Sequence, residues 1–204
     1  IQAWIRCGNR ESLLHAEAIA ESIISRDYPD IEPRLLTFYP ILAAWVYSGS
    51  EEGPQKVDYW TDLLEETVPD LQPRLTFPNL SIMAQTSLQR NILNRQRNFL
   101  DLDNSRAESC IFESAKRCSQ ILDKSIQQYK DSLASDIQSD AFMLVINAWF
   151  NAASSAMLQN NLQETKNCFK EIQNAVDQFD DMLRWFHQVG AIGTENNEST
   201  DFQA

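Results

Sequence analysis

The side chains that most often perform catalysis are few in this chain and lie far apart. The 204 residues include two histidines, His15 and His187, and neither belongs to a His-Glu-x-x-His motif. No serine or cysteine forms a pattern typical of a nucleophile with its base, and no glycine-rich phosphate loop is present. The adjacent carboxylates Asp180 and Asp181 would point apart on a helix. The sequence therefore predicts a protein that is not an enzyme and uses no cofactor.

The cysteines give no sign of a metal centre. The chain has four of them, and no two form a Cys-x-x-Cys pair: Cys7, Cys110, Cys118 and Cys168. Each lies in an apolar or helical context. We interpret them as reduced, packed thiols of a cytosol-like compartment, and we predict no metal site.

One basic segment interrupts an otherwise acidic chain. The net charge is −12, from 29 acidic and 17 basic residues, yet no Asp or Glu occurs between residues 71 and 100. This segment is either a phosphate-contacting patch or a solvated loop whose arginines pair with acidic neighbours. The acidic stretch 51–70 is likewise either the solvated face of a helix or a docking site for a basic partner. The arginines of the basic segment are Arg74, Arg90, Arg95 and Arg97.

Two short motifs recur at a spacing of about forty residues. The heptapeptide 29–35 returns as 69–75, with five of its seven positions identical. An Ala-Trp pair occurs at Trp4, Trp45 and Trp149. A period in the range of roughly 20–50 residues is typical of helix-pair repeats, in which one unit cannot bury its apolar face alone and stacks on its neighbours.

The repeat predicts an all-α fold, a right-handed α-solenoid of helix-pair repeats. Gly8 and Gly49 each follow an Ala-Trp helix by four residues and are expected to end it in a left-handed conformation. Pro33 and Pro73 are expected to precede the next first helix. The three recurring tryptophans should fill the space between helix layers.

The motifs divide the chain into about four units and a tail. No uninterrupted apolar run approaches the roughly 20 residues of a membrane span, so we expect no membrane segment. Because residue 1 is Ile and falls inside an expected helix, we also expect the chain to be part of a longer protein. The predicted units are 1–32, 33–72, 73–137 with an insert at about 89–108, and 138–189, followed by a disordered tail at 190–204.

Together these elements resemble pentatricopeptide repeats. The resemblance rests on the Ala-Trp ending, the glycine beyond it, the Ala16-Glu17-Ala18-Ile19 second helix and the Pro-Arg-Leu-Thr-Phe restart at 73–77. It implies single-stranded RNA binding along a concave surface of first helices, in RNA processing or expression in a mitochondrion or plastid. It also implies that each unit reads one base with a residue in the first turn and the residue just before that helix, which are Asn79 and Arg74 in the third unit.

Two functions remain open at this stage. The pairs equivalent to Asn79 and Arg74 in the second and fourth units offer no usual polar base reader. The first hypothesis is single-stranded RNA binding; the alternative is a protein–protein interaction scaffold with an acidic surface, for which a cytoplasmic location is expected. The RNA hypothesis assigns contacts to Asn79, Arg74, Arg90, Arg95 and Arg97.

Overall fold

A computed structural model describes residues 1–27, 30, 34–67, 76–98, 104–132 and 139–195. Within these ranges the protein consists of eight α-helices and has no strand, which confirms the all-α prediction. The helices are α1 (Gln2–Arg6), α2 (Arg10–Ile24), α3 (Leu35–Ser48), α4 (Gly53–Thr67), α5 (Thr76–Asn98), α6 (Asn104–Ser132), α7 (Ser139–Leu158) and α8 (Leu162–Glu195).

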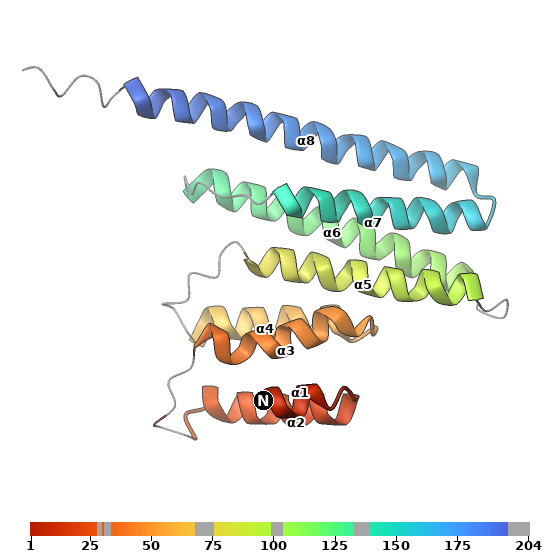
Figure 1. Cartoon of the computed structure of the whole chain (residues 1–204). Coiled ribbons are helices and arrows are strands. Elements are labelled where there is room, and N and C mark those ends of the chain that lie inside the picture. Colours follow the sequence, from red (N-terminus) through yellow and green to blue (C-terminus); the bar gives the residue numbers. More distant parts are fainter. Residues whose placement is uncertain (28–29, 31–33, 68–75, 99–103, 133–138, 196–204) are drawn as a thin grey trace, which may run out of the picture.

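The helices stack in chain order, from α1 and α2 at one end to α8 at the other (Figure 1). Consecutive helices pack in pairs: α1 with α2, α3 with α4, α5 with α6, and α7 with α8. We call α1, α3, α5 and α7 the first helices, and α2, α4, α6 and α8 the second helices. The backbones of successive first helices also approach closely, since α1 contacts α3, α3 contacts α5 and α5 contacts α7.

Local sequence signals set the helix ends. Gly8 and Gly49 have φ angles of 71° and 60°, which confirms that each is left-handed, and Gly49 directly caps α3. The Asn9 side chain accepts a hydrogen bond from the Ser12 backbone N–H at 2.8 Å and so caps α2. Asn161 caps α8 in the same way.

Aromatic residues at repeated positions form the core. Trp45 and Trp149 are only 2% and 3% exposed, as expected for residues between helix layers. Trp4, however, is 42% exposed, so its predicted place in the core is wrong. Trp45 and Trp149 are covered by the second helix of the preceding pair, and no helix before α1 is present among the described residues to cover Trp4.

Two predicted boundaries are corrected by the structure. Residues 89–98 are not an insert between helices but the second half of α5, and residues 104–108 begin α6. The chain has no Gly or Pro between Pro78 and 138 to break these helices. The tail does not begin at 190, because α8 continues to Glu195; its two late glycines weaken a helix without ending it.

One helix is long and apolar enough to cross a membrane by length and composition alone. This stretch of α7, Asp140–Leu158, has a mean hydropathy of 1.4 and is half buried in the protein. It contains no uninterrupted apolar run of that length because polar residues punctuate it. Two of these, Asn151 and Ser155, hydrogen-bond to α5, so α7 serves here as a core helix between its neighbours.

Candidate nucleic-acid interface

The two flanks of α5 are fixed by polar contacts to its neighbours. On one flank the Asn91 side chain donates to the Gly49 carbonyl at the end of α3, at 2.8 Å. On the other flank Gln89 accepts from Asn151 of α7 at 3.3 Å. Gln89 is fully buried and also donates to the Ile111 carbonyl of α6 at 2.8 Å. These contacts leave one side of α5, opposite α6 and between α3 and α7, without a helix against it.

Two of the predicted arginines lie on this uncovered side. Arg90, Asn94 and Arg97 are spaced by four and three residues, so they share one stripe of α5, and all three are exposed. Arg95 is exposed as well but lies farther around the helix. The structure thus brings Arg90 and Arg97 together on an open surface, on a regular helix rather than on the expected insert.

The predicted base reader is not beside them. Asn79 is only 9% exposed, so its amide is largely covered. It precedes Arg90 by eleven residues, which places it about 16 Å away along the axis of α5. Arg74 lies outside the described residues. Of the base-reading pair implied by the family resemblance, the structure therefore describes only Asn79, and it places that side chain in a mostly covered position.

An exposed aromatic side chain lies on α3, the helix that flanks the arginine stripe. Tyr47, near the end of α3, is 70% exposed. Because Asn91 binds the carbonyl of Gly49, Tyr47 and Arg90 lie at the same level on neighbouring helices. Sequence analysis did not single out this tyrosine, since its position beside α5 depends on how the two helices pack. An exposed ring beside guanidinium groups is the combination that single-stranded nucleic-acid sites use to stack bases and hold phosphates.

The charges of the chain are divided between the two sets of helices. The first helices contain four arginines and one aspartate. The second helices contain seventeen acidic and ten basic residues. The overall charge of −12 therefore does not describe the first-helix side, which carries a small positive charge within the described helices.

A buried carboxylate joins the first two helix pairs. Glu17 of α2 is 4% exposed, and its Oε1 accepts hydrogen bonds from the indole N–H groups of Trp45 at 2.9 Å and Trp60 at 2.6 Å. Its Oε2 pairs with the Lys56 ammonium at 3.0 Å. Sequence analysis missed this role, because Glu17 resembles any charged helix residue until the two tryptophans are placed around it.

The same link recurs along the stack. Asp58 of α4 accepts from the Ser81 hydroxyl of α5 at 2.8 Å and pairs with Arg117 of α6 at 3.5 Å. Ser119 of α6 accepts from the Trp149 indole of α7 at 2.8 Å. We call Glu17, Asp58 and Ser119 the acceptor position, because each receives a hydrogen bond from the first helix of the next pair. Lys56 precedes Asp58 by two residues, and Arg117 precedes Ser119 by two residues. The ion pair of Lys56 with Glu17 is therefore equivalent to that of Arg117 with Asp58, one helix pair further along.

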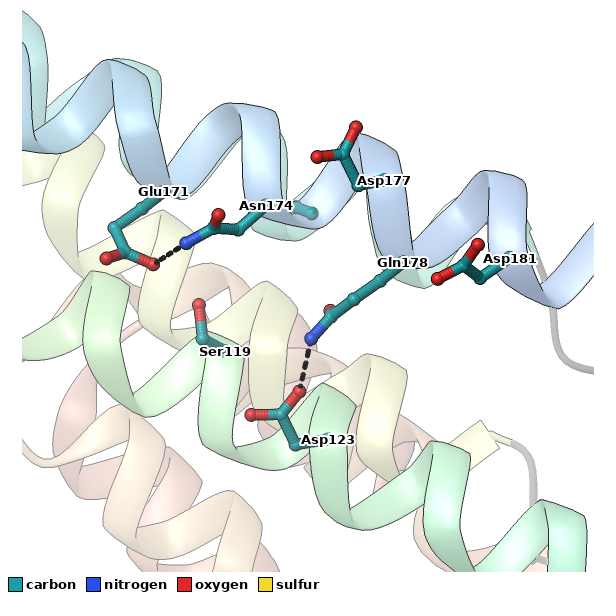
Figure 2. A pocket seen from close by; sticks show the side chains of 8 residues that line it. Ser119, Asp123, Glu171, Asn174, Asp177, Gln178 and Asp181 are labelled. Atoms are coloured by element: carbon teal, nitrogen blue, oxygen red, sulfur yellow. Dashed lines mark hydrogen bonds between the residues drawn. The ribbon is translucent and has the colours of Figure 1, made fainter.

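A polar cavity of about 310 Å³ lies between α6 and α8 (Figure 2). Gln178 of α8 crosses it to donate to Asp123 of α6 at 3.0 Å. Asn174 donates to Glu171 at 3.1 Å within α8. No group of three or more His, Cys, Asp or Glu side chains that could hold a metal ion occurs in the described part of the chain. The lining residues are Ser119, Asp123, Glu171, Asn174, Ala175, Asp177, Gln178 and Asp181.

The cysteines differ widely in their surroundings. All four are free thiols; Cys7 is exposed, whereas Cys118 and Cys168 are buried. Burial raises the pKa of Cys118 to about 12 and that of Cys168 to about 11. Burial also raises the pKa of Cys110, with a further contribution from nearby Glu51. Raised values disfavour the reactive thiolate, so these three positions are poor nucleophiles.

Comparison with known proteins adds no assignment. No family model matches the chain, and comparisons with curated proteins and with solved structures found no match.

Proposed function

We propose that this chain is a non-enzymatic helical-repeat module that binds single-stranded RNA along its first helices. The observation that carries the proposal is the uncovered stripe of Arg90, Asn94 and Arg97 on α5, with the exposed Tyr47 ring at the same level on the neighbouring α3. Phosphates would contact the guanidinium groups, and a base would stack on the tyrosine.

The proposed architecture is a right-handed α-solenoid of pentatricopeptide-like units. Its support is the difference between the two helix sets. Successive first helices pack backbone to backbone, whereas second helices reach one another through side-chain pairs such as Lys56 with Glu17 and Arg117 with Asp58. A stack that is tighter on one side bends toward that side, so the first helices, including the arginine stripe, would line the concave surface.

The test is binding of the purified chain to a fluorescent pool of single-stranded RNA at two salt concentrations. Replacing Arg90, Arg95 and Arg97 with alanine should abolish most of the binding. Removing one arginine that holds a phosphate should reduce the salt slope by about 0.7, so losing the two arginines of the stripe should reduce it by about 1.4. The matched control replaces Lys116 and Arg184, exposed cations of the second helices whose ion pairs are with i−3 neighbours, and should leave binding unchanged.

A protein-interaction scaffold is the second candidate. The observation that favours it is the excess of carboxylates on the second helices, which suits a basic partner. Absence of any RNA binding by the unmodified chain at low salt would overturn the RNA proposal and favour the scaffold. Unchanged binding by the triple variant would show that the α5 arginines are not the contact site.

A further inference from the structure

The last helix carries an apolar stripe that faces solvent. Four large apolar residues of α8 recur every seven positions: Leu162, Phe169, Val176 and Leu183. They are 73%, 45%, 36% and 41% exposed, respectively. The adjoining side of α8 supplies the buried contacts to the core, through residues such as Cys168 and Met182, so the stripe flanks the buried face of the helix. A seven-residue spacing places the four exposed side chains along one line of the helix, about 32 Å long.

The stripe continues onto α7. The rings of Phe150 and Phe169 meet edge to face, with their centroids 6.1 Å apart. Phe150 is 46% exposed, and Met143 and Met157 on the same side of α7 are each 56% exposed. Two adjacent helices are about 20 Å wide, so this apolar face measures on the order of 600 Å². An apolar face of this size is at the upper end of what a monomeric protein exposes, and such faces are often functional.

The equivalent face of each inner pair is covered by the next pair. Phe150 follows Trp149 as Val46 follows Trp45, and Val46 is fully buried. Phe169 stands eight residues after the capping Asn161, as Glu17 stands eight residues after the capping Asn9. Glu17 is 4% exposed and receives hydrogen bonds from the next pair. At this distance from its cap, α2 therefore carries a carboxylate that the next pair covers, whereas α8 carries an exposed aromatic ring.

The charges beside the stripe are arranged for pairing with a second copy of α8 in the opposite direction. Lys166 and Lys170 lie in its first half, and Asp177 and Asp180 in its second half. In an antiparallel pair, Leu162 meets Leu183 of the second copy and Phe169 meets Val176 of the second copy. Each lysine then lies level with an aspartate of the other helix, to within about 3 Å along the axis. A parallel pair would instead oppose like charges.

We propose that the apolar face of α7 and α8 is a homodimer interface in which two α8 helices pair antiparallel. The two-fold symmetry makes the interface self-complementary and closed. Two faces of this size would bury on the order of 1,200 Å² in total, which lies within the range of specific interfaces. This proposal does not depend on RNA binding, because the arginine stripe belongs to α5.

The first test is the mass of the purified chain by light scattering and sedimentation over a range of concentrations. The expected result is a dimer that dissociates on dilution. Phe169→Asp should raise the dissociation constant roughly 30-fold or more, as for a central apolar residue of an interface. The control is Leu36→Asp on α3, where the leucine is 83% exposed and belongs to another surface; it should not change the mass. Circular dichroism checks that both variants remain helical.

Charge reversal tests the direction of the pairing. Lys166→Asp and Asp180→Lys should each weaken the dimer, and the double variant should restore it, because each reversed charge regains an opposite partner. A chain that is monomeric at all concentrations would overturn the proposal. So would growth into open oligomers, which would indicate head-to-tail stacking, or a double variant weaker than both single variants.

Discussion

Replacing Glu17 with alanine tests whether the buried carboxylate holds the first two helix pairs together. The substitution removes the acceptor for the Trp45 and Trp60 indole N–H groups and the counter-ion of Lys56. Both indoles are nearly or fully buried and have no access to water, whereas the lysine side chain is 33% exposed and can rehydrate. Most of the loss in unfolding free energy should therefore come from the two unpaired indole N–H groups.

The size of the effect follows from the groups left unpaired. Each buried N–H without a partner costs about 1–3 kcal/mol, and breaking a buried ion pair costs about 3–5 kcal/mol in total. We expect Glu17→Ala to lower the free energy of unfolding by about 3–5 kcal/mol. For a chain of about 200 residues this corresponds to a fall in Tm of about 6–20 °C. Glu17→Gln should cost about half as much, because its carbonyl oxygen still accepts from the indoles.

The assay is urea and thermal unfolding followed by circular dichroism, with tryptophan fluorescence as the local probe. The matched control is Glu21→Ala, one turn later on α2. Glu21 is exposed and accepts only a 3.3 Å hydrogen bond from Tyr59, so the change should stay within about 0.5 kcal/mol. A loss below about 1 kcal/mol for Glu17→Ala, or equal losses for both variants, would refute the reasoning.

Three further predictions follow from the contacts described above. Gln89→Leu should lower the unfolding free energy by about 1–2 kcal/mol in urea unfolding, because it removes the hydrogen bonds that the buried amide makes with the Ile111 carbonyl and with Asn151. Gly49→Ala should lower the unfolding free energy more than Gly8→Ala in the same assay. Both glycines have positive φ, so an alanine at either position carries a backbone penalty of about 1 kcal/mol. Only at Gly49 would the new methyl group also lie 3.0 Å from a neighbouring side chain. With a thiol reagent at pH 8, the exposed Cys7 should react rapidly and the buried Cys118 only after unfolding, because a pKa of about 12 leaves roughly one Cys118 thiolate in ten thousand. The reaction of Cys118 should accelerate only as the pH rises toward that pKa. Rapid reaction of two or more thiols in the native protein would contradict this prediction.

The parts of the fold that sequence predicted well are those set by local chemistry. Gly8 and Gly49 are left-handed because a helix that ends there needs a residue without a Cβ penalty, and this can be inferred from neighbouring residues alone. The helix content follows from apolar spacing and few breakers. The length of α5 was misjudged because its second half is mostly polar, although Leu93 and the buried glutamine Gln89 both contribute to the core.

The candidate site was predicted only in part, because some of its residues are set by contacts between helices that are far apart in the sequence. Arg90 and Arg97 were found because a run without acidic residues is visible in the sequence. Tyr47 was missed because its relation to Arg90 depends on the contact between Asn91 and Gly49, which joins residues 42 positions apart. Glu17 was missed because burial of a carboxylate depends on donors from α3 and α4, and no local pattern encodes those partners.

The links within the stack and the surface at its end depend on side chains of different chemistry. A carboxylate or hydroxyl at the acceptor position stabilises the fold only where the next pair supplies fixed donors, as Trp45 does for Glu17 and Trp149 does for Ser119. Without such donors, a polar group there would simply be hydrated and would specify no contact. Phe169 needs no donor, and covering its ring is favourable against any complementary apolar face. The exposed Phe169 ring is therefore suited to contact with a second molecule, which is the role that the dimer proposal assigns to it.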